Sequence, residues 1–311
     1  MLVFRSLEEA AASGALRGGA VTVGNMDGVH LGHRRLIQVA RELAPAAGVL
    51  TFDPHPVKVL RPELAPPLLT PLPRKLELLG GLGLTAAVVQ PFDRAYAATP
   101  AAEFVARDLA GRLAVRQVVV GQDFTAGRER ARVDALRPLL QARGISLHVV
   151  EPVTADGLVV SSTKIREFVL EGNVGAAAEL LTRPYDVDAT VVRGAGRGRG
   201  FGFATANLET DQLLPANGVY VVRARIGAGG PGGQERAGVC NVGVKPTVEV
   251  AGGIVAEVHL LDFDGRDLYG EPMRVAFLHR LRDERRFPSI DALRAQIARD
   301  VEEARATWGS R

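Results

Sequence analysis

The stretch "VTVGNMDGVHLGHRRLI", residues 21–37, joins a short apolar run, a turn rich in glycine and the start of a basic helical pattern. The apolar run ends at Gly24, and a helix is predicted over residues 34–44. Two of the chain's six histidines, His30 and His33, stand at this junction. A buried strand that turns directly into a helix is typical of parallel α/β sheets, so this stretch indicates the fold class.

The first half of the chain repeats this alternation of strand and helix. The strand candidates are apolar almost throughout, as expected for strands covered on both faces; they are residues 20–24, 48–52, 86–90, 117–121 and 146–150. Helices are predicted between and after them, at residues 34–44, 73–80, 100–113, 133–143, 163–171 and 174–181. The pattern predicts an α/β domain built on a parallel sheet.

The pattern changes after about residue 186, where runs rich in valine recur without long helices between them. These runs are residues 188–194, 218–226, 236–244, 254–263 and 272–281. They predict an antiparallel β-barrel. A final helix is expected after Ser289, which is a plausible N-cap residue. We therefore expect an α/β domain over residues 1–185 and a β-barrel domain with a terminal helix over residues 186–311.

The composition sets limits on the class of protein. The 311 residues fit two domains, and 47% are hydrophobic against 23% charged, so the chain can bury two cores. The net charge of +3 permits anionic partners but does not call for nucleic acid. A single cysteine, Cys240, excludes a disulfide within the chain and fits a buried small side chain. No apolar run approaches about 20 residues, and a cytoplasmic protein without membrane or nucleic-acid partners is expected.

The histidine turn has the form of an anion-binding site. Glycines at Gly24 and nearby let the backbone approach a ligand, and a helix N-terminus presents unpaired amides there. Imidazoles beside those amides can donate hydrogen bonds to phosphate oxygens. Two alternatives stay open on this segment alone: a structural role for His30 and His33, and a zinc site with His55 as third ligand.

A second segment, "SSTKIREFVL" at residues 161–170, has similar chemistry. Hydroxyl groups at the predicted start of a helix are followed by the cations of Lys164 and Arg166. A polyphosphate binds well between two such helix ends. One capped basic helix is commonplace, but two segments of this kind in one α/β unit favour a nucleotide site.

These motifs resemble those of a known family. "GNMDGVHLGH" is similar to the H-x-G-H motif of the nucleotidyltransferase superfamily, and "SSTKIR" to its second phosphate-binding motif. Together with "TFDPHP" and "GQDF", they resemble the adenylyltransferase half of the bacterial bifunctional riboflavin kinase/FAD synthetase. The resemblance continues through "GRGFGFATANLE", "NVGVKPTV", "EVHLLDFDGRDLYG" and "LRDERRF". It implies a Rossmann-like nucleotidyltransferase domain followed by a riboflavin kinase barrel.

The resemblance implies that FMN attacks the α-phosphate of ATP in the first domain, which yields FAD and pyrophosphate. His30 and His33 would serve the α-phosphate, Arg166 the distal phosphates, and Mg²⁺ would bridge phosphate oxygens. The other expected nucleotide-binding residues of this domain are Gly24, Asp27, Asp123, Ser162, Thr163 and Lys164.

In the second domain the resemblance implies phosphorylation of riboflavin by ATP. Thr205 and Asn207 lie two residues apart on an extended segment, so their oxygens share one face and suit Mg²⁺. Glu257 matches the family's general base, and Gly198 and Gly202 would lie against the nucleotide phosphates. A solvated strand carboxylate is the alternative for Glu257. A monomer or weak homo-oligomer is expected.

The sequence departs from the family pattern in one loop above all. Relatives carry Phe-Gly where Ala126-Gly127 stands, and Gly-Asp where Arg132-Val133 stands. Ala204 and Thr182 replace the family's usual proline and glycine. Two alternatives follow: a riboflavin kinase whose adenylyltransferase half is weakened or takes another substrate, and a flavin- or nucleotide-binding regulator without turnover.

Overall fold

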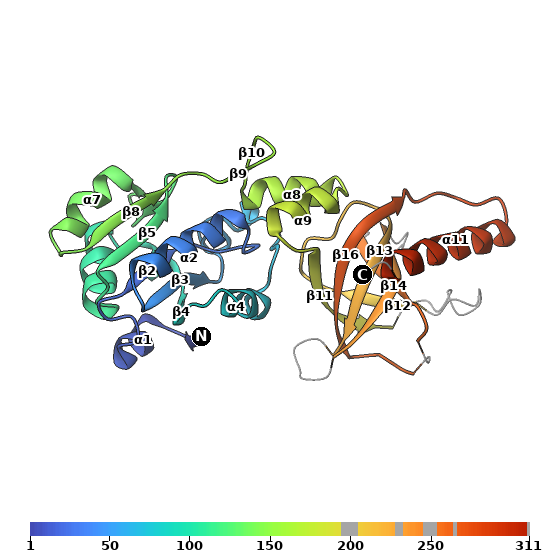
Figure 1. The fold of residues 1–311 in the computed structure, drawn as a ribbon, viewed down its shortest axis with the longest axis horizontal. Coiled ribbons are helices and arrows are strands. Elements are labelled where there is room, and N and C mark those ends of the chain that lie inside the picture. Colours follow the sequence, from blue (N-terminus) through green and yellow to red (C-terminus); the bar gives the residue numbers. More distant parts are fainter. Residues whose placement is uncertain (194–204, 228–232, 245–253, 264–265, 310–311) are drawn as a thin grey trace. The chain divides into compact units, whose positions relative to one another are not determined.

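The computed structural model describes residues 1–193, 205–227, 233–244, 254–263 and 266–309 (Figure 1). Gly198, Gly202 and Ala204 lie outside the described residues. The chain forms two compact units. Unit 1 comprises residues 1–66 and 71–161, and unit 2 comprises residues 67–70 and 162–311.

A six-stranded parallel sheet forms the centre of unit 1 (Figure 1). Its order is β1-β4-β3-β2-β5-β8, and every neighbouring pair is parallel. The strands are β1 (Leu2–Phe4), β2 (Ala20–Val23), β3 (Ala47–Asp53), β4 (Ala86–Pro91), β5 (Gln117–Gly121) and β8 (Ser146–Val150). The predicted parallel sheet is confirmed. β1 was not predicted, because three residues are too few to show a pattern.

Helices cover both faces of this sheet. α2 (Leu31–Leu43) and α4 (Leu72–Gly80) pack on the face that carries Val49 and Val119. The opposite face, with Leu50 and Val118, is covered by α1 (Leu7–Ser13), α7 (Val133–Gln141) and a helical segment between residues 104 and 112. Neighbouring strand residues thus enter different cores, which explains why the strands are apolar throughout.

The helix predicted at residues 100–113 has a different form. It consists of α6 (Ala101–Glu103) and η2 (Phe104–Arg112), and η2 is a π-helix. The Leu113 N–H donates to the Asp108 carbonyl oxygen, five residues back, at 2.9 Å. Hydrophobic periodicity does not separate α- from π-helices over so short a segment, so the sequence did not reveal this change.

Short elements complete unit 1. The helices are α3 (Pro56–Leu60), η1 (Pro62–Leu64) and α5 (Arg94–Ala97). Two small antiparallel hairpins are β6–β7 (Thr125–Ala126 and Ala131–Arg132) and β9–β10 (Thr154–Ala155 and Leu158–Val159). The β6–β7 hairpin occupies the loop in which the sequence departs from the family pattern.

Unit 2 is built on a closed antiparallel barrel in the order β11-β12-β15-β14-β13-β16. The strands are β11 (Tyr185–Val192), β12 (Ala206–Glu209), β13 (Gly218–Ile226), β14 (Gln234–Val244), β15 (Ile254–Leu260) and β16 (Pro272–Arg282). Cys240, Val242 and Val258 are fully buried on its strands. The predicted barrel is confirmed, and Cys240 is buried as expected.

Two helices precede the barrel, α8 (Ser162–Leu170) and α9 (Val174–Leu181). The sequence placed them in the first domain, which was expected to end at residue 185. Their contacts group them with the barrel instead, because α8 packs on α9, and α9 packs on β11 and β16. α9 ends at Leu181, and its C-cap residue Thr182 has a φ of 60°, a conformation that glycine adopts at lower cost.

The terminal helix α11 (Ile290–Gly309) packs on the outside of the barrel. Its Ala304 is buried with Val219, Val221 and Val239. The Ser289 hydroxyl accepts a hydrogen bond from the Ala292 N–H at 3.2 Å, which confirms the predicted N-cap. Across the described ranges, we find no helix with the length and hydropathy that a membrane span needs.

Candidate active sites

The candidate site of unit 1 lies at the sheet edge where the strands end. β2 is flanked by β3 on one side and by β5 on the other, so the strand order reverses between β2 and β5. In open α/β sheets, ligands bind at the carboxyl ends of strands at such a point. The histidine turn follows β2 directly, and Asp123 follows β5 in an exposed position. The topology therefore brings the predicted histidines and Asp123 to one edge.

The two histidines stack on each other at the start of α2. Their ring centroids are 3.6 Å apart, with an angle of 20° between the ring planes. α2 begins at Leu31 and has His30 as its N-cap residue, so the predicted start at residue 34 was three residues late. Gly32 makes room for the stack, because a Cβ there would lie 3.2 Å from the His30 Nδ1 and Cε1 atoms. The spacing H-x-G-H thus has a steric reason in addition to any ligand contact.

The turn before the histidines is conformationally strained. Met26, Gly28 and Val29 have φ angles of 54°, 88° and 45°. For the two residues with side chains this conformation costs about 1–3 kcal/mol each. The Met26 and Val29 side chains are buried in the core beneath α2, and burial of apolar surface offsets that cost. The Gly24 N–H donates to the Leu50 carbonyl oxygen at 3.0 Å, which ties the turn to β3.

His33 has a buried polar atom, as expected for a residue of a ligand site. Its Nδ1 atom is buried, although the residue as a whole is partly exposed, and has no hydrogen-bond partner among the described residues. Burial lowers the pKa of His33 well below its usual value, and the neighbouring His30 and Lys75 lower it further. His33 is therefore neutral at pH 7, so it can donate one hydrogen bond to a phosphate but adds no positive charge.

Lys75 is a buried charged residue close to His33 that the sequence analysis missed. It lies on α4, is 6% exposed, and its pKa is lowered by burial and raised in part by Asp27 and Asp53. Asp27, predicted to bind nucleotide, is itself buried close to this lysine. The sequence contained one indication that Lys75 is buried. It lies four residues before the apolar Leu79 and so shares its helix face.

His55, two residues after the end of β3, lies against the turn. Its Nε2 atom lies 3.1 Å from the Asn25 amide nitrogen, and the Thr51 hydroxyl donates to the Asn25 carbonyl oxygen at 3.1 Å. The ring nitrogen Nδ1 of His55 accepts from the Val57 N–H at 3.2 Å, as the cap of α3. Among the described residues, no three His, Cys, Asp or Glu side chains are grouped to hold a metal ion. His55 therefore does not complete a zinc site with the pair.

The second predicted phosphate motif lies on α8 of unit 2. Ser162 begins this helix, and Thr163 is exposed in its first turn. Lys164 forms an ion pair with Glu167. The Arg166 Nε atom donates to the Pro67 carbonyl oxygen at 2.9 Å, which links α8 to the segment at residues 67–70. The joint action of this helix with the histidine turn stays a prediction.

The candidate site of the barrel is a row of polar residues across three strands. Glu257 on β15 lies directly opposite Asn207 on β12 and Asn241 on β14. Residues opposite each other in antiparallel strands have Cβ atoms about 4.5–5.5 Å apart. Thr205 precedes β12 by one residue. The structure thus brings Asn207 and Glu257 together, as the motif predicts, and adds Asn241, which the sequence analysis missed in the run "CNVGV".

Comparisons with known proteins match both halves of the chain. The family model for FAD synthetase matches residues 13–164, and the model for riboflavin kinase matches residues 181–308. A bifunctional riboflavin kinase/FMN adenylyltransferase from Pseudomonas fluorescens is 38% identical over 296 residues, 93% of each chain. The protein of the same description from Haemophilus influenzae is 35% identical and covers 100% of both chains.

The chain belongs to the bifunctional riboflavin kinase/FMN adenylyltransferase family. It is a transferase with a FAD synthetase domain followed by a riboflavin kinase domain. A crystal structure described as a macrolide-efflux protein from Streptococcus pneumoniae is 30% identical, with a TM-score of 0.82 over 93% of this chain and 94% of that one. That protein therefore shares the fold of this family member.

Proposed function

We propose that the histidine site of unit 1 transfers the adenylyl group of ATP to FMN, and that the barrel phosphorylates riboflavin to FMN. One observation carries the first assignment. The His33 ring stacks on the His30 ring at a helix N-terminus, and its Nδ1 atom is buried. We assign the adenylyltransferase to residues 1–185 and the kinase to residues 186–311. The cytoplasmic location and the monomer or weak homo-oligomer stay predictions.

In the first reaction, a phosphate oxygen of FMN attacks the α-phosphorus of ATP. The bond from that phosphorus to the bridging oxygen breaks, and pyrophosphate leaves with its electron pair. The FMN phosphate is the nucleophile, so the protein has to align the reactants and stabilise charge. His30 and His33 donate hydrogen bonds to the α-phosphate beside the amides of α2. Ser162, Thr163, Lys164 and Arg166 on α8 stay the predicted ligands of the distal phosphates.

In the second reaction, the 5′-hydroxyl of riboflavin attacks the γ-phosphorus of ATP, and ADP leaves. Glu257 accepts the hydroxyl proton as general base. The side-chain oxygens of Thr205 and Asn207 are hard donors, so this pair fits Mg²⁺. When bound, Mg²⁺ neutralises charge on the ATP phosphates. Thr205 and Asn207 would hold the ion, while Gly198 and Gly202 would approach the phosphates.

The proposal is tested by separating riboflavin, FMN and FAD after incubation of the protein with riboflavin, ATP and Mg²⁺. The wild-type chain should form FMN first and FAD after it. The His33→Ala variant should form FMN but no FAD. The control variant His148→Ala, in which a different histidine of unit 1 is replaced, should still form FAD. Formation of FMN alone by the wild-type chain would support the weakened adenylyltransferase, and no product would support the regulator.

The barrel assignment is tested in the same assay by Glu257→Gln. This variant should form no FMN from riboflavin but should convert added FMN to FAD at the wild-type rate. Glu209→Gln, the same change at an exposed position of β12, should leave both reactions intact. Kinase turnover by Glu257→Gln would exclude Glu257 as the base.

A further inference from the structure

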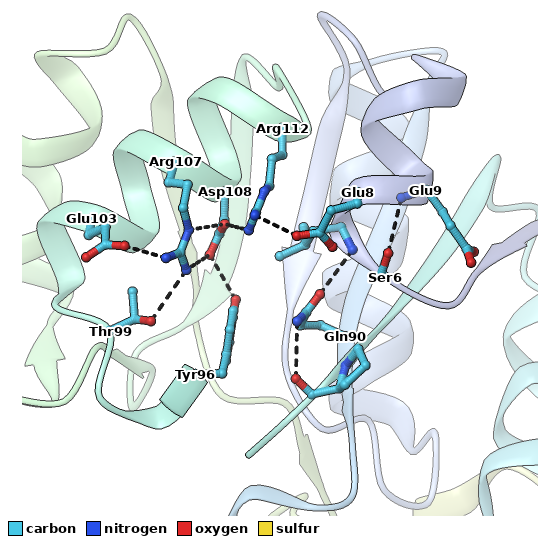
Figure 2. A network of polar contacts seen from close by, with 12 residues as sticks. Ser6, Glu8, Glu9, Gln90, Tyr96, Thr99, Glu103, Arg107, Asp108 and Arg112 are labelled. Carbon is cyan, nitrogen blue, oxygen red and sulfur yellow. Dashed lines mark hydrogen bonds and ion pairs between the residues drawn. The ribbon is translucent and has the colours of Figure 1, made fainter. Parts of the chain in front are cut away.

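Asp108 and Lys75 are buried charged side chains of unit 1 that differ in how they are paired. Asp108 on η2 is 0% exposed, and Figure 2 shows its carboxylate among hydrogen-bond donors. The Tyr96 hydroxyl donates to it at 3.0 Å, the Arg107 Nε atom at 2.9 Å and the Arg112 Nη1 atom at 2.8 Å. These bonds replace those that water would make, so Asp108 fits a structural role. Lys75 is 6% exposed, and within the part of the chain that the structure describes its ammonium forms no hydrogen bond or ion pair.

The position of α4 brings Lys75 to the sheet edge that carries the histidine turn. α4 connects β3 to its parallel neighbour β4, so the helix runs back along the sheet and begins at the edge where β3 ends. Lys75 is the fourth residue of α4. One helical turn later, Leu79 packs in the same core as Met26 and Val29 of the histidine turn. Lys75 therefore lies on the face of α4 that meets this turn.

The charges around Lys75 come from three other segments of the site. They are Asp27 in the histidine turn, Asp53 at the end of β3 and His33 on α2. Burial lowers the pKa of Lys75, and the two carboxylates, which favour the charged ammonium, offset this only in part. The charged form of Lys75 thus costs stability in the folded chain. A buried charge that is kept at such a cost is typical of a functional site.

The proposed reaction at the histidine site calls for a positive charge. His33 is neutral at pH 7 and therefore adds none. In adenylyl transfer, the anionic phosphate of FMN has to approach the α-phosphate of ATP, which is itself negatively charged. A cation held at the α-phosphate reduces this repulsion and stabilises the charge of the transition state.

We propose that Lys75 is a catalytic residue of the histidine site, and that its ammonium contacts a non-bridging oxygen of the ATP α-phosphate. This inference rests on the proposed function. Lys75 neutralises charge while the bond from the FMN phosphate oxygen to the α-phosphorus forms and the bond to the pyrophosphate oxygen breaks. It forms no covalent bond and transfers no proton. Lysine suits this role because an apolar stem can be buried in the core while the charge stays at its tip.

Lys75→Met tests this inference, because it keeps an unbranched apolar side chain and removes the charge. In the full-length protein with Mg²⁺, kcat for FAD formation from FMN should fall about 100-fold or more, as for removal of one preorganised donor from a transition-state site. KM for FMN and for ATP should change less than about three-fold, and the riboflavin kinase rate less than about two-fold. The denaturation midpoint should not fall, because an apolar side chain replaces a buried charge that lacks a hydrogen bond.

Two further variants complete the test. Lys75→Arg keeps the positive charge and should lose less of its kcat than Lys75→Met. Arg41→Met is the control, because it removes an exposed cation in the last turn of α2, and its kcat and denaturation midpoint should match those of wild type.

Two results would overturn the inference and leave the proposed function intact. One is a wild-type kcat in Lys75→Met. The other is a loss of kcat together with a lower denaturation midpoint, since Lys75 would then serve the fold as the internal partner of Asp27 and Asp53. If the wild-type chain makes no FAD, the proposed function itself fails.

Discussion

The surroundings of His33 keep its imidazole neutral, and this determines how it can bind phosphate. Burial, His30 and Lys75 all disfavour its protonated form. Such an imidazole binds phosphate as a hydrogen-bond donor, and positive charge must come from other groups. The same condition links the histidine to stability, because the unfolded chain binds a proton there more readily than the folded chain does.

We therefore predict that the free energy of unfolding decreases as the pH falls below about 6.5, the usual pKa of histidine. The contribution of neutral His33 to the free energy of unfolding is fully present above that pH. It decreases as the pH falls from about 6.5 to the lowered pKa of His33 in the folded chain. His33→Gln should show a smaller decrease between pH 7.5 and pH 5.5 in denaturant titrations. His148→Gln should keep the wild-type decrease, and an identical slope for His33→Gln would contradict the prediction.

The proximity of individual residues was predictable where a motif fixed their spacing. The stacked histidines and the opposed pair Asn207 and Glu257 were anticipated in this way. Lys75 was not, because a buried charge breaks the hydrophobic pattern and because the two carboxylates that raise its pKa, Asp27 and Asp53, are distant in sequence.

At the scale of elements, register decides whether the barrel site exists. The pairing of β12, β15 and β14 puts Asn207, Glu257 and Asn241 in one row. A shift of β15 by one residue would move Glu257 to the other face of the sheet, away from Asn207 and Asn241. The closed barrel fixes the pairing on both sides of β15, so the row is determined by the fold.

The helix α11 is attached to the barrel by an ion pair as well as by apolar contacts. Arg282 on β16 donates to both oxygens of Asp300, from Nε to Oδ1 at 3.2 Å and from Nη2 to Oδ2 at 2.8 Å, and Asp300 is 4% exposed. We predict that Asp300→Ala lowers the free energy of unfolding by about 2–4 kcal/mol, because it leaves a guanidinium without its partner. Glu302→Ala, at an exposed position of the same helix, should cost less than about 0.5 kcal/mol. Equal denaturation midpoints for the two variants would contradict this.

Strands were predicted more closely than helices. β5, β8 and β13 have the predicted bounds, because β-branched runs end at turn residues. The start of α2 was missed because His30 caps it without a side-chain hydrogen bond, which leaves no sequence signal. The π-helix η2 was missed because its defining hydrogen bond has no counterpart in the pattern of side chains.

At the scale of the whole molecule, the two candidate sites belong to different reactions that share FMN. FMN is the product of the riboflavin kinase domain and the substrate of the FAD synthetase domain. The two sites use separate residues, so each can be removed without the other. The boundary expected at residue 185 could not be refined from sequence, because helices α8 and α9 continue the α/β pattern while packing with the barrel.

This arrangement predicts complementation between variants. His33→Ala should make FMN but no FAD, and Glu257→Gln should make FAD only from added FMN. A mixture of the two, supplied with riboflavin and ATP, should form FAD after a lag in which FMN accumulates in solution. Product separation over time measures this. Absence of FAD from the mixture, while each variant keeps its remaining reaction, would mean that FMN passes only within one chain.

The single thiol of the chain has a practical consequence. Burial raises the pKa of Cys240 and keeps it un-ionised within the barrel, so maleimide dyes will not react with the native protein there. Cysteines introduced at exposed positions, one in each unit, could therefore be labelled without first replacing Cys240. Energy transfer between such dyes would follow the separation of the two units while flavin is turned over.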